Sequence, residues 1–169
     1  MDSQRTHNPH NAHARYAVGM VLGLTGEIDI TTVIPVVVGA HIRAEISDRQ
    51  TAQWLADQLS DELADTCPGL CAIVCTDLWY LNDDRLRTRP TISVGEPELN
   101  AYAAFLADKL PDVYSVKDVL VVQMDLRGDD TTASCWGRDA IATRQAAQAF
   151  AERYLSGFVE SVARQHEND

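Results

Sequence analysis

The sequence has no long apolar run. No stretch approaches the ~18 consecutive apolar residues that a membrane-spanning helix requires. The N-terminal residues also lack the small-residue cleavage pattern of a secretory signal. We therefore expect a cytoplasmic protein that does not act in a membrane.

Positive charge is scarce. The chain carries 14 Lys and Arg against 25 Asp and Glu, which gives a net charge of −11. Such a field repels the phosphate backbone of nucleic acids and the surface of anionic membranes. The charge therefore predicts neither a nucleic acid nor a membrane as partner.

Recognisable catalytic and nucleotide-binding motifs are also missing. The sequence has no G-x-G-x-x-G, G-x-x-x-x-G-K-[ST], G-x-S-x-G or H-E-x-x-H pattern. It therefore gives no grounds to assign a catalytic residue or a cofactor. Whether the protein is an enzyme stays open, and a binding role is the favoured interpretation.

Four cysteines are present, but not in the close pairs typical of zinc sites. Three of them, Cys67, Cys71 and Cys75, are spaced four apart, and Cys135 is distant. In a strand, Cys71 and Cys75 share one face, which suits reduced thiols in a core. Carboxylates around Asp77 could bind magnesium, but a charged surface loop is the favoured interpretation, so we assign no metal site.

The length of 169 residues, 46% of them hydrophobic, fits one domain with a substantial core. Residues 1–12 are polar and without periodicity, which predicts a flexible tail. We expect residues 13–169 to form a single α/β domain.

Hydrophobic periodicity predicts alternating helices and strands. Segment 31–46 is ambiguous, because Val and Ile favour a strand whereas its length and its end favour a helix; we interpret it as a buried helix. The other expected helices are 49–65, 98–110 and 137–164, the last with a possible break at Gly157, and the expected strands are 71–81, 91–94, 118–126 and 132–136. The pattern predicts an α/β fold with a mixed sheet of about four strands covered by helices and a helical N-terminal third.

Two segments share a strand, a glycine, a polar turn and the start of a helix. They read SVGEPELNAYAAFL (93–106) and CWGRDAIATRQAAQA (135–149). If the two strands are parallel, both helix N-termini face one edge of the sheet, where unpaired N–H groups attract anions. The candidate ligand-binding residues are Gly95, Asn100, Gly137, Arg138, Asp139 and Thr143. Alternatively, these segments are only corners with capping side chains.

The two corners resemble repeated corners of archaeal surface-layer proteins, which read approximately V-G-G-P-x-x-N and G-x-x-x-x-x-T-R-x-A. Gly95, Pro97 and Asn100 match the first pattern, and Glu96 departs from its second glycine; Gly137, Thr143, Arg144 and Ala146 match the second. Similar segments occur in uncharacterised bacterial proteins. The resemblance implies a strand–corner–helix plan, and a surface-layer role is not expected without an export signal or a stalk.

Aromatic residues make up only 7% of the chain, and several lie near arginines. The candidate partner-binding residues are Trp79, Tyr80, Arg85, Arg87, Arg89 and Trp136. We therefore expect a protein that binds a protein partner or self-associates. The alternative is an enzyme or sensor that binds a small anionic ligand where the two glycine corners meet.

Overall fold

The computed structural model describes residues 29–125 and 131–167. The predicted tail at residues 1–12 and the start of the predicted domain lie outside the described residues. Within them, no helix is both long and apolar enough to cross a membrane.

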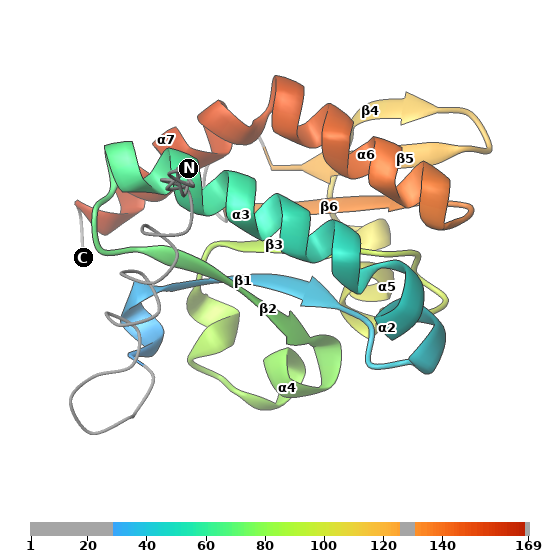
Figure 1. The fold of residues 1–169 in the computed structure, drawn as a ribbon, viewed down its shortest axis with the longest axis horizontal. Coiled ribbons are helices and arrows are strands. Elements are labelled where there is room, and N and C mark those ends of the chain that lie inside the picture. The colour runs from blue at the N-terminus through green and yellow to red at the C-terminus, as the bar shows by residue number, and fades with distance from the viewer. Residues whose placement is uncertain (1–28, 126–130, 168–169) are drawn as a thin grey trace, which may run out of the picture.

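A mixed sheet of six strands runs through the described part of the chain, in the order β2-β1-β3-β6-β5-β4 (Figure 1). The strands are β1 (Val33–Val38), β2 (Cys71–Thr76), β3 (Thr91–Val94), β4 (Asp112–Val116), β5 (Leu120–Met124) and β6 (Thr132–Gly137). Four neighbouring strands (β2, β1, β3 and β6) are parallel, whereas β5 and β4 add antiparallel hairpins. The predicted α/β fold with a mixed sheet is confirmed, with six strands rather than about four.

Helices cover both faces of this sheet (Figure 1). They are α2 (Ile42–Ser47), α3 (Arg49–Thr66), α4 (Asp77–Asn82), α5 (Ala101–Ala107), α6 (Ala140–Arg153) and α7 (Leu155–His166), with short 3-10 turns at Ile30–Thr32 and Leu86–Thr88. One core lies between the sheet and α3, α6 and α7, and a smaller core lies under α4 and α5. Alternate residues of β1 enter the two cores, as the two-residue period of a strand requires.

The interpretation of 31–46 as a buried helix, and with it the helical N-terminal third, is wrong. Residues Val33–Val38 form a strand that is buried on both faces, which is the pattern of a parallel strand covered by helices on both sides. Pro35 precedes the three residues that pair with β3, so its missing N–H does not interrupt that pairing. Apart from the 3-10 turn that ends at Thr32, only the end of the segment is helical, from Ile42.

Three further elements differ from the prediction. The expected strand 71–81 ends at Thr76, whose hydroxyl accepts a hydrogen bond from the amide of Trp79 and so caps α4. Strand β4 was not predicted, because it is a short, mostly exposed edge strand with a weak apolar pattern. The closing helix is divided at Tyr154 rather than at Gly157.

Gly137 and Gly157 provide a matched pair of substitutions. A Cβ at Gly137 would lie 2.5 Å from the backbone carbon of Ala142, whereas a Cβ at Gly157 would meet nothing within 4 Å. We expect Gly137→Ala to lower the free energy of unfolding by about 1–3 kcal/mol, because the start of α6 must shift. Gly157→Ala should raise it by about 0.5–1 kcal/mol, because Ala is the better helix former. Urea denaturation measures both; a neutral Gly137→Ala would contradict the packing described.

Candidate functional site

The direction of the chain connections changes at the centre of the sheet. From β1 the chain crosses to β2 on one side, and from β2 it returns to β3 on the other side of β1. The carboxyl ends of β1, β3 and β6 therefore lie next to each other at one edge. In open α/β sheets, ligands bind outside the carboxyl ends of the strands at such a switch point.

The two predicted glycine corners are confirmed and lie side by side at this edge. Gly95 directly follows β3 with a φ of +110°, a conformation that side chains disfavour, and its N–H donates to the carbonyl of Cys135 (3.1 Å). Gly137 ends β6, and its N–H donates to the hydroxyl of Thr143 (3.1 Å). Both strands lead directly from the sheet into the loops that shape this edge.

Asn100 fixes the first corner from within the protein. Its fully buried amide nitrogen donates to the carbonyls of Val37 (3.1 Å) and Val94 (3.0 Å) and to the hydroxyl of Ser93 (3.1 Å). Its amide oxygen caps α5 by accepting from the backbone of Tyr102 and Ala103. All the hydrogen-bonding groups of Asn100 are thus engaged within the protein, so its role is structural and not ligand binding.

Asp77 performs a similar role beyond β2. Its carboxylate accepts hydrogen bonds from the backbone amides of Ala40, Leu78 and Ala101, each at 2.8 Å. These bonds tie the loop after β1 and the start of α5 to α4. The possible magnesium ligand of the sequence analysis is therefore occupied by backbone amides; within 29–125 and 131–167, no cluster of three or more His, Cys, Asp or Glu residues could hold a metal ion.

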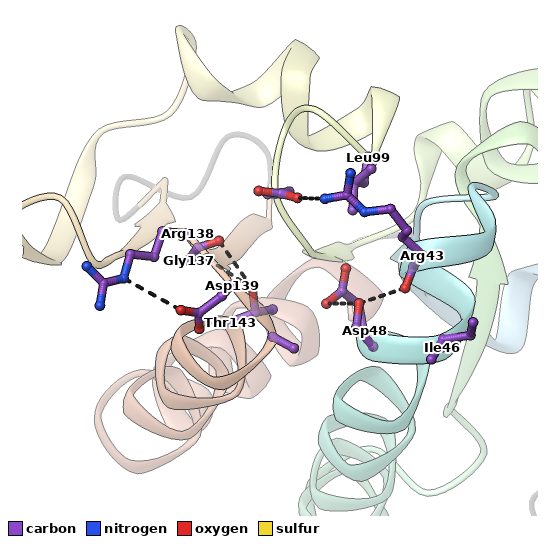
Figure 2. Close-up of a pocket in the computed structure, with 11 residues that line it drawn as sticks. Arg43, Ile46, Asp48, Leu99, Gly137, Arg138, Asp139 and Thr143 are labelled. Atoms are coloured by element: carbon purple, nitrogen blue, oxygen red, sulfur yellow. Dashed lines mark hydrogen bonds and ion pairs between the residues drawn. The ribbon is translucent and has the colours of Figure 1, made fainter.

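A pocket of about 350 Å³ opens between the two corners and the α2–α3 junction (Figure 2). It is lined by Arg43, Ile46, Ser47, Asp48, Glu96, Leu99, Gly137, Arg138, Asp139, Ala140 and Thr143. Of the predicted ligand-binding residues, the four of the second corner line the pocket. Gly95 and Asn100 lie behind its wall and shape it instead.

Asp48 is the buried acid of this pocket, at the junction of α2 and α3 (Figure 2). Its side chain is 3% exposed. One carboxylate oxygen accepts from the hydroxyl of Ser47 (3.0 Å); the other, Oδ2, has no hydrogen-bond donor among the residues that the structure describes, and lies 2.8 Å from where a Cβ of Gly95 would be. Burial raises the pKa of Asp48, an effect that Glu96 strengthens and that Ser47 and Arg43 oppose.

The N-terminus of α6 forms the opposite wall. Asp139 caps this helix by accepting from the amide of Ala142 (2.9 Å), and the guanidinium of Arg138 lies 3.6 Å from the carboxylate of Asp139. The amides of Ala140 and Ile141 have no hydrogen-bond acceptor within the described part of the chain. These amides and the helix dipole provide a site of partial positive charge.

An ion pair closes one side of the pocket. Arg43 of α2 contacts Glu96 of the first corner at 3.4 Å, with side-chain exposures of 67% and 22% (Figure 2). Both side chains come from segments that flank the mouth. Because Arg43 is largely solvated, the pair is weak and can separate to admit a ligand.

Sequence reasoning missed Arg43, Asp48 and Glu96 as pocket residues. Asp48 occupies the N-cap position of α3, although its side chain makes no capping hydrogen bond. No local pattern distinguishes a capping aspartate from one that turns inward. Its position in the same pocket as the second corner depends on the order of the strands in the sheet.

The predicted aromatic partner residues do not form one surface. Trp79 is 40% exposed, but Tyr80 is buried, with its ring centroid 4.4 Å from that of Tyr102. Trp136 is only partly exposed. Trp136 lies on β6, whereas Trp79 lies on α4, which directly follows β2. Strands β1 and β3 lie between β2 and β6, so these two strands are about 14 Å apart at ~4.8 Å per strand. The prediction that Tyr80 anchors a partner is contradicted by its burial.

The predicted arginine cluster is engaged within its own loop. Arg85 pairs with Asp83 (3.0 Å), and Arg87 pairs with Asp84. Arg89 donates to a backbone carbonyl at the start of β1 (3.3 Å). The arginines thus balance neighbouring acids and hold the loop.

The four cysteines are free and buried, as predicted. Burial raises the pKa of Cys71 to about 11 and that of Cys75 to about 12, and it raises the pKa of Cys135 as well. Thiols with such raised pKa values are poor nucleophiles and poor metal ligands at neutral pH. Their role is core packing.

Comparison with known proteins gives no relative: no family model, curated protein or solved structure matches the chain. The resemblance of the two corners to archaeal surface-layer segments therefore stays a prediction.

The raised pKa of Asp48 predicts a stability that depends on pH. The carboxyl of Asp48 has a higher pKa in the folded protein than in the unfolded chain. The fold therefore gains stability from this group below the unfolded pKa, and that gain is lost as the pH rises through the folded pKa. Ionised Asp48 thus lowers stability at neutral pH. We expect Asp48→Asn to raise the free energy of unfolding at pH 7, with a gain that shrinks as the pH falls through this window.

Denaturation with urea over a series of pH values measures the effect. Asp57→Asn provides the control, because Asp57 lies on the same helix but is exposed. If Asp48→Asn destabilises the protein equally at every pH, the buried carboxylate carries no desolvation cost.

Proposed function

We propose that the protein binds a small charged molecule in the pocket between the two glycine corners. The observation that carries the proposal is the free oxygen of Asp48, a side chain only 3% exposed that lines a pocket at the switch point of the sheet. Asp48 lines the pocket, and its Oδ2 has no donor among the described residues, so a donor group of a ligand in the pocket can reach it.

The volume and lining of the pocket support this proposal. Its volume of about 350 Å³ lies at the small end of the range for ligand sites. The apolar side chains of Ile46 and Leu99 stand beside the charged ones, a combination that suits a molecule of metabolite size. The two hydroxyls of the lining are engaged within the protein, that of Ser47 with the carbonyl of Arg43 and that of Thr143 with the amide of Gly137, so we propose binding rather than catalysis.

A location in the cytoplasm belongs to the same proposal. Four buried cysteines remain as thiols with no disulfide between them, which is typical of a reducing compartment. The net charge of −11 keeps such a protein dispersed.

Blocking the pocket tests the proposal. Ala140 is exposed at the start of α6 and lines the pocket, so Ala140→Trp places a large ring at its mouth. A screen by thermal shift with carboxylates, phosphates, nucleotides, amino acids and amines should yield a ligand that raises the melting temperature. At a hundredfold excess over Kd, the expected shift is roughly 5–10 °C.

The shift should vanish in Ala140→Trp and persist in Ala104→Trp, a matched change at an exposed position of α5 outside the pocket. A shift that survives in Ala140→Trp would place the ligand elsewhere. If no compound in the screen binds the folded protein, the proposal is wrong.

Self-association is a second candidate function, and exposed apolar side chains favour it. On the neighbouring helices α4 and α5, Leu78 is 64% exposed, Trp79 40% and Phe105 53%. The two helices are in contact through the rings of Tyr80 and Tyr102. A second copy that covers these helices would remove the three apolar side chains from water.

Light scattering at several protein concentrations tests self-association. We expect a mass above that of the monomer, reduced to the monomer by Leu78→Lys because a charge in the interface is costly to bury. Val116→Lys, at a 41% exposed apolar position on the edge strand β4, should leave the mass unchanged. A monomer at every concentration would exclude this function.

A further inference from the structure

Two complementary sites of charge face the same pocket. On one wall, Oδ2 of Asp48 has no donor among the described residues, although the residue as a whole is only 3% exposed. On the other wall, the amide of Ala140, the first residue of α6, has no acceptor among the described residues. The two observations are independent, because the acid comes from the α2–α3 junction and the amide comes from the helix after β6.

The other four charged side chains of the pocket form two ion pairs. Arg43 contacts Glu96 at 3.4 Å, and Arg138 contacts Asp139 at 3.6 Å. While both pairs are formed, one negative group remains, Asp48, together with one partial positive charge, the N-terminus of α6. The pocket thus presents a separated negative and positive end with almost no net charge.

A ligand with a single charge meets only half of these requirements. A phosphate or a simple carboxylate could accept from the amides of α6, but it would leave Asp48 without a partner and would stand near its negative charge. A simple amine could pair with Asp48 and would leave the amide of Ala140, which lines the pocket, unused. A molecule with an ammonium group and an acidic group satisfies both walls.

We propose that the pocket binds a small zwitterion, with its ammonium group on Asp48 and its carboxylate on the N-terminus of α6. This inference rests on the proposed function and names the ligand class for the same pocket. It revises the expected anionic ligand: the anion site at the second corner is kept, and Asp48 adds a cation site opposite to it. The apolar side chains of Ile46 and Leu99 are available to contact the carbon chain between the two groups.

A series of ω-amino acids of increasing length, from glycine to 6-aminohexanoate, measures the spacing of the two sites. The matched controls are the straight-chain carboxylates and the straight-chain amines of the same lengths, each of which lacks one charged group. Calorimetric titration should show a maximum of affinity at one length. At that length, each singly charged control should bind at least about tenfold more weakly, because one charge-assisted contact is lost.

Asp48→Asn assigns the ammonium site. We expect it to weaken binding of the best ω-amino acid by about tenfold or more and to leave binding of the matching carboxylate unchanged within about twofold. Asp57→Asn, at an exposed position of the same helix, should bind both compounds as the wild type does. Because Asn is isosteric with Asp, loss of folding is not expected, and the melting temperature without ligand verifies this.

The outcomes separate this inference from the proposed function. A carboxylate, an amine or inorganic phosphate could bind at least as tightly as the best zwitterion and lose its melting-temperature shift in Ala140→Trp. In that case the pocket is a ligand site but the zwitterion inference is wrong. Equal affinity of Asp48→Asn and wild type for the best zwitterion also overturns it. If neither this series nor the broader screen binds, both proposals fail.

Discussion

The side-chain amide of Asn100 holds the carboxyl edge of the sheet together. Its two N–H hydrogens are shared among three acceptors at the ends of β1 and β3, its oxygen accepts from two amides in the first turn of α5, and the group is completely buried. An amide is the side-chain group that can do this, because it offers donors to the strand carbonyls and an acceptor to the helix amides at the same time. The position of the first corner, and with it one wall of the pocket, depends on these bonds.

Asp77 and Asp48 show how two carboxylates at one edge take different roles. The carboxylate of Asp77 accepts from three backbone amides, so its charge stabilises the loops around it. That of Asp48 accepts from one hydroxyl, and burial raises its pKa. A buried charge that is only partly satisfied lowers the stability of the fold, which is the pattern expected where a side chain serves a ligand rather than the scaffold.

The sequence was sufficient for the fold class and for the corners, but not for the pocket. The glycines, Asn100 and the alanine-rich helices have local signatures, and for this reason both corners were predicted at the correct residues. Residues 33–38 were misjudged because a continuous apolar run lacks the alternation of a half-buried strand. Arg43, Asp48 and Glu96 were missed because their meeting with the second corner depends on the order β1-β3-β6, which no single segment encodes.

Gly95 links the scaffold to the proposed site. Its φ of +110° turns the chain from β3 into the loop that carries Glu96, and the space that a side chain would fill is taken by the carboxylate of Asp48. The backbone turn and the buried acid therefore need glycine for two separate reasons, conformation and room. Because the same residue also donates its N–H to β6, any shift of the loop that relieved Asp48 would disturb the pairing of the strands. Asp48 also lines the pocket, so its carboxylate stands between the corner that Gly95 makes and the space in which a ligand would lie.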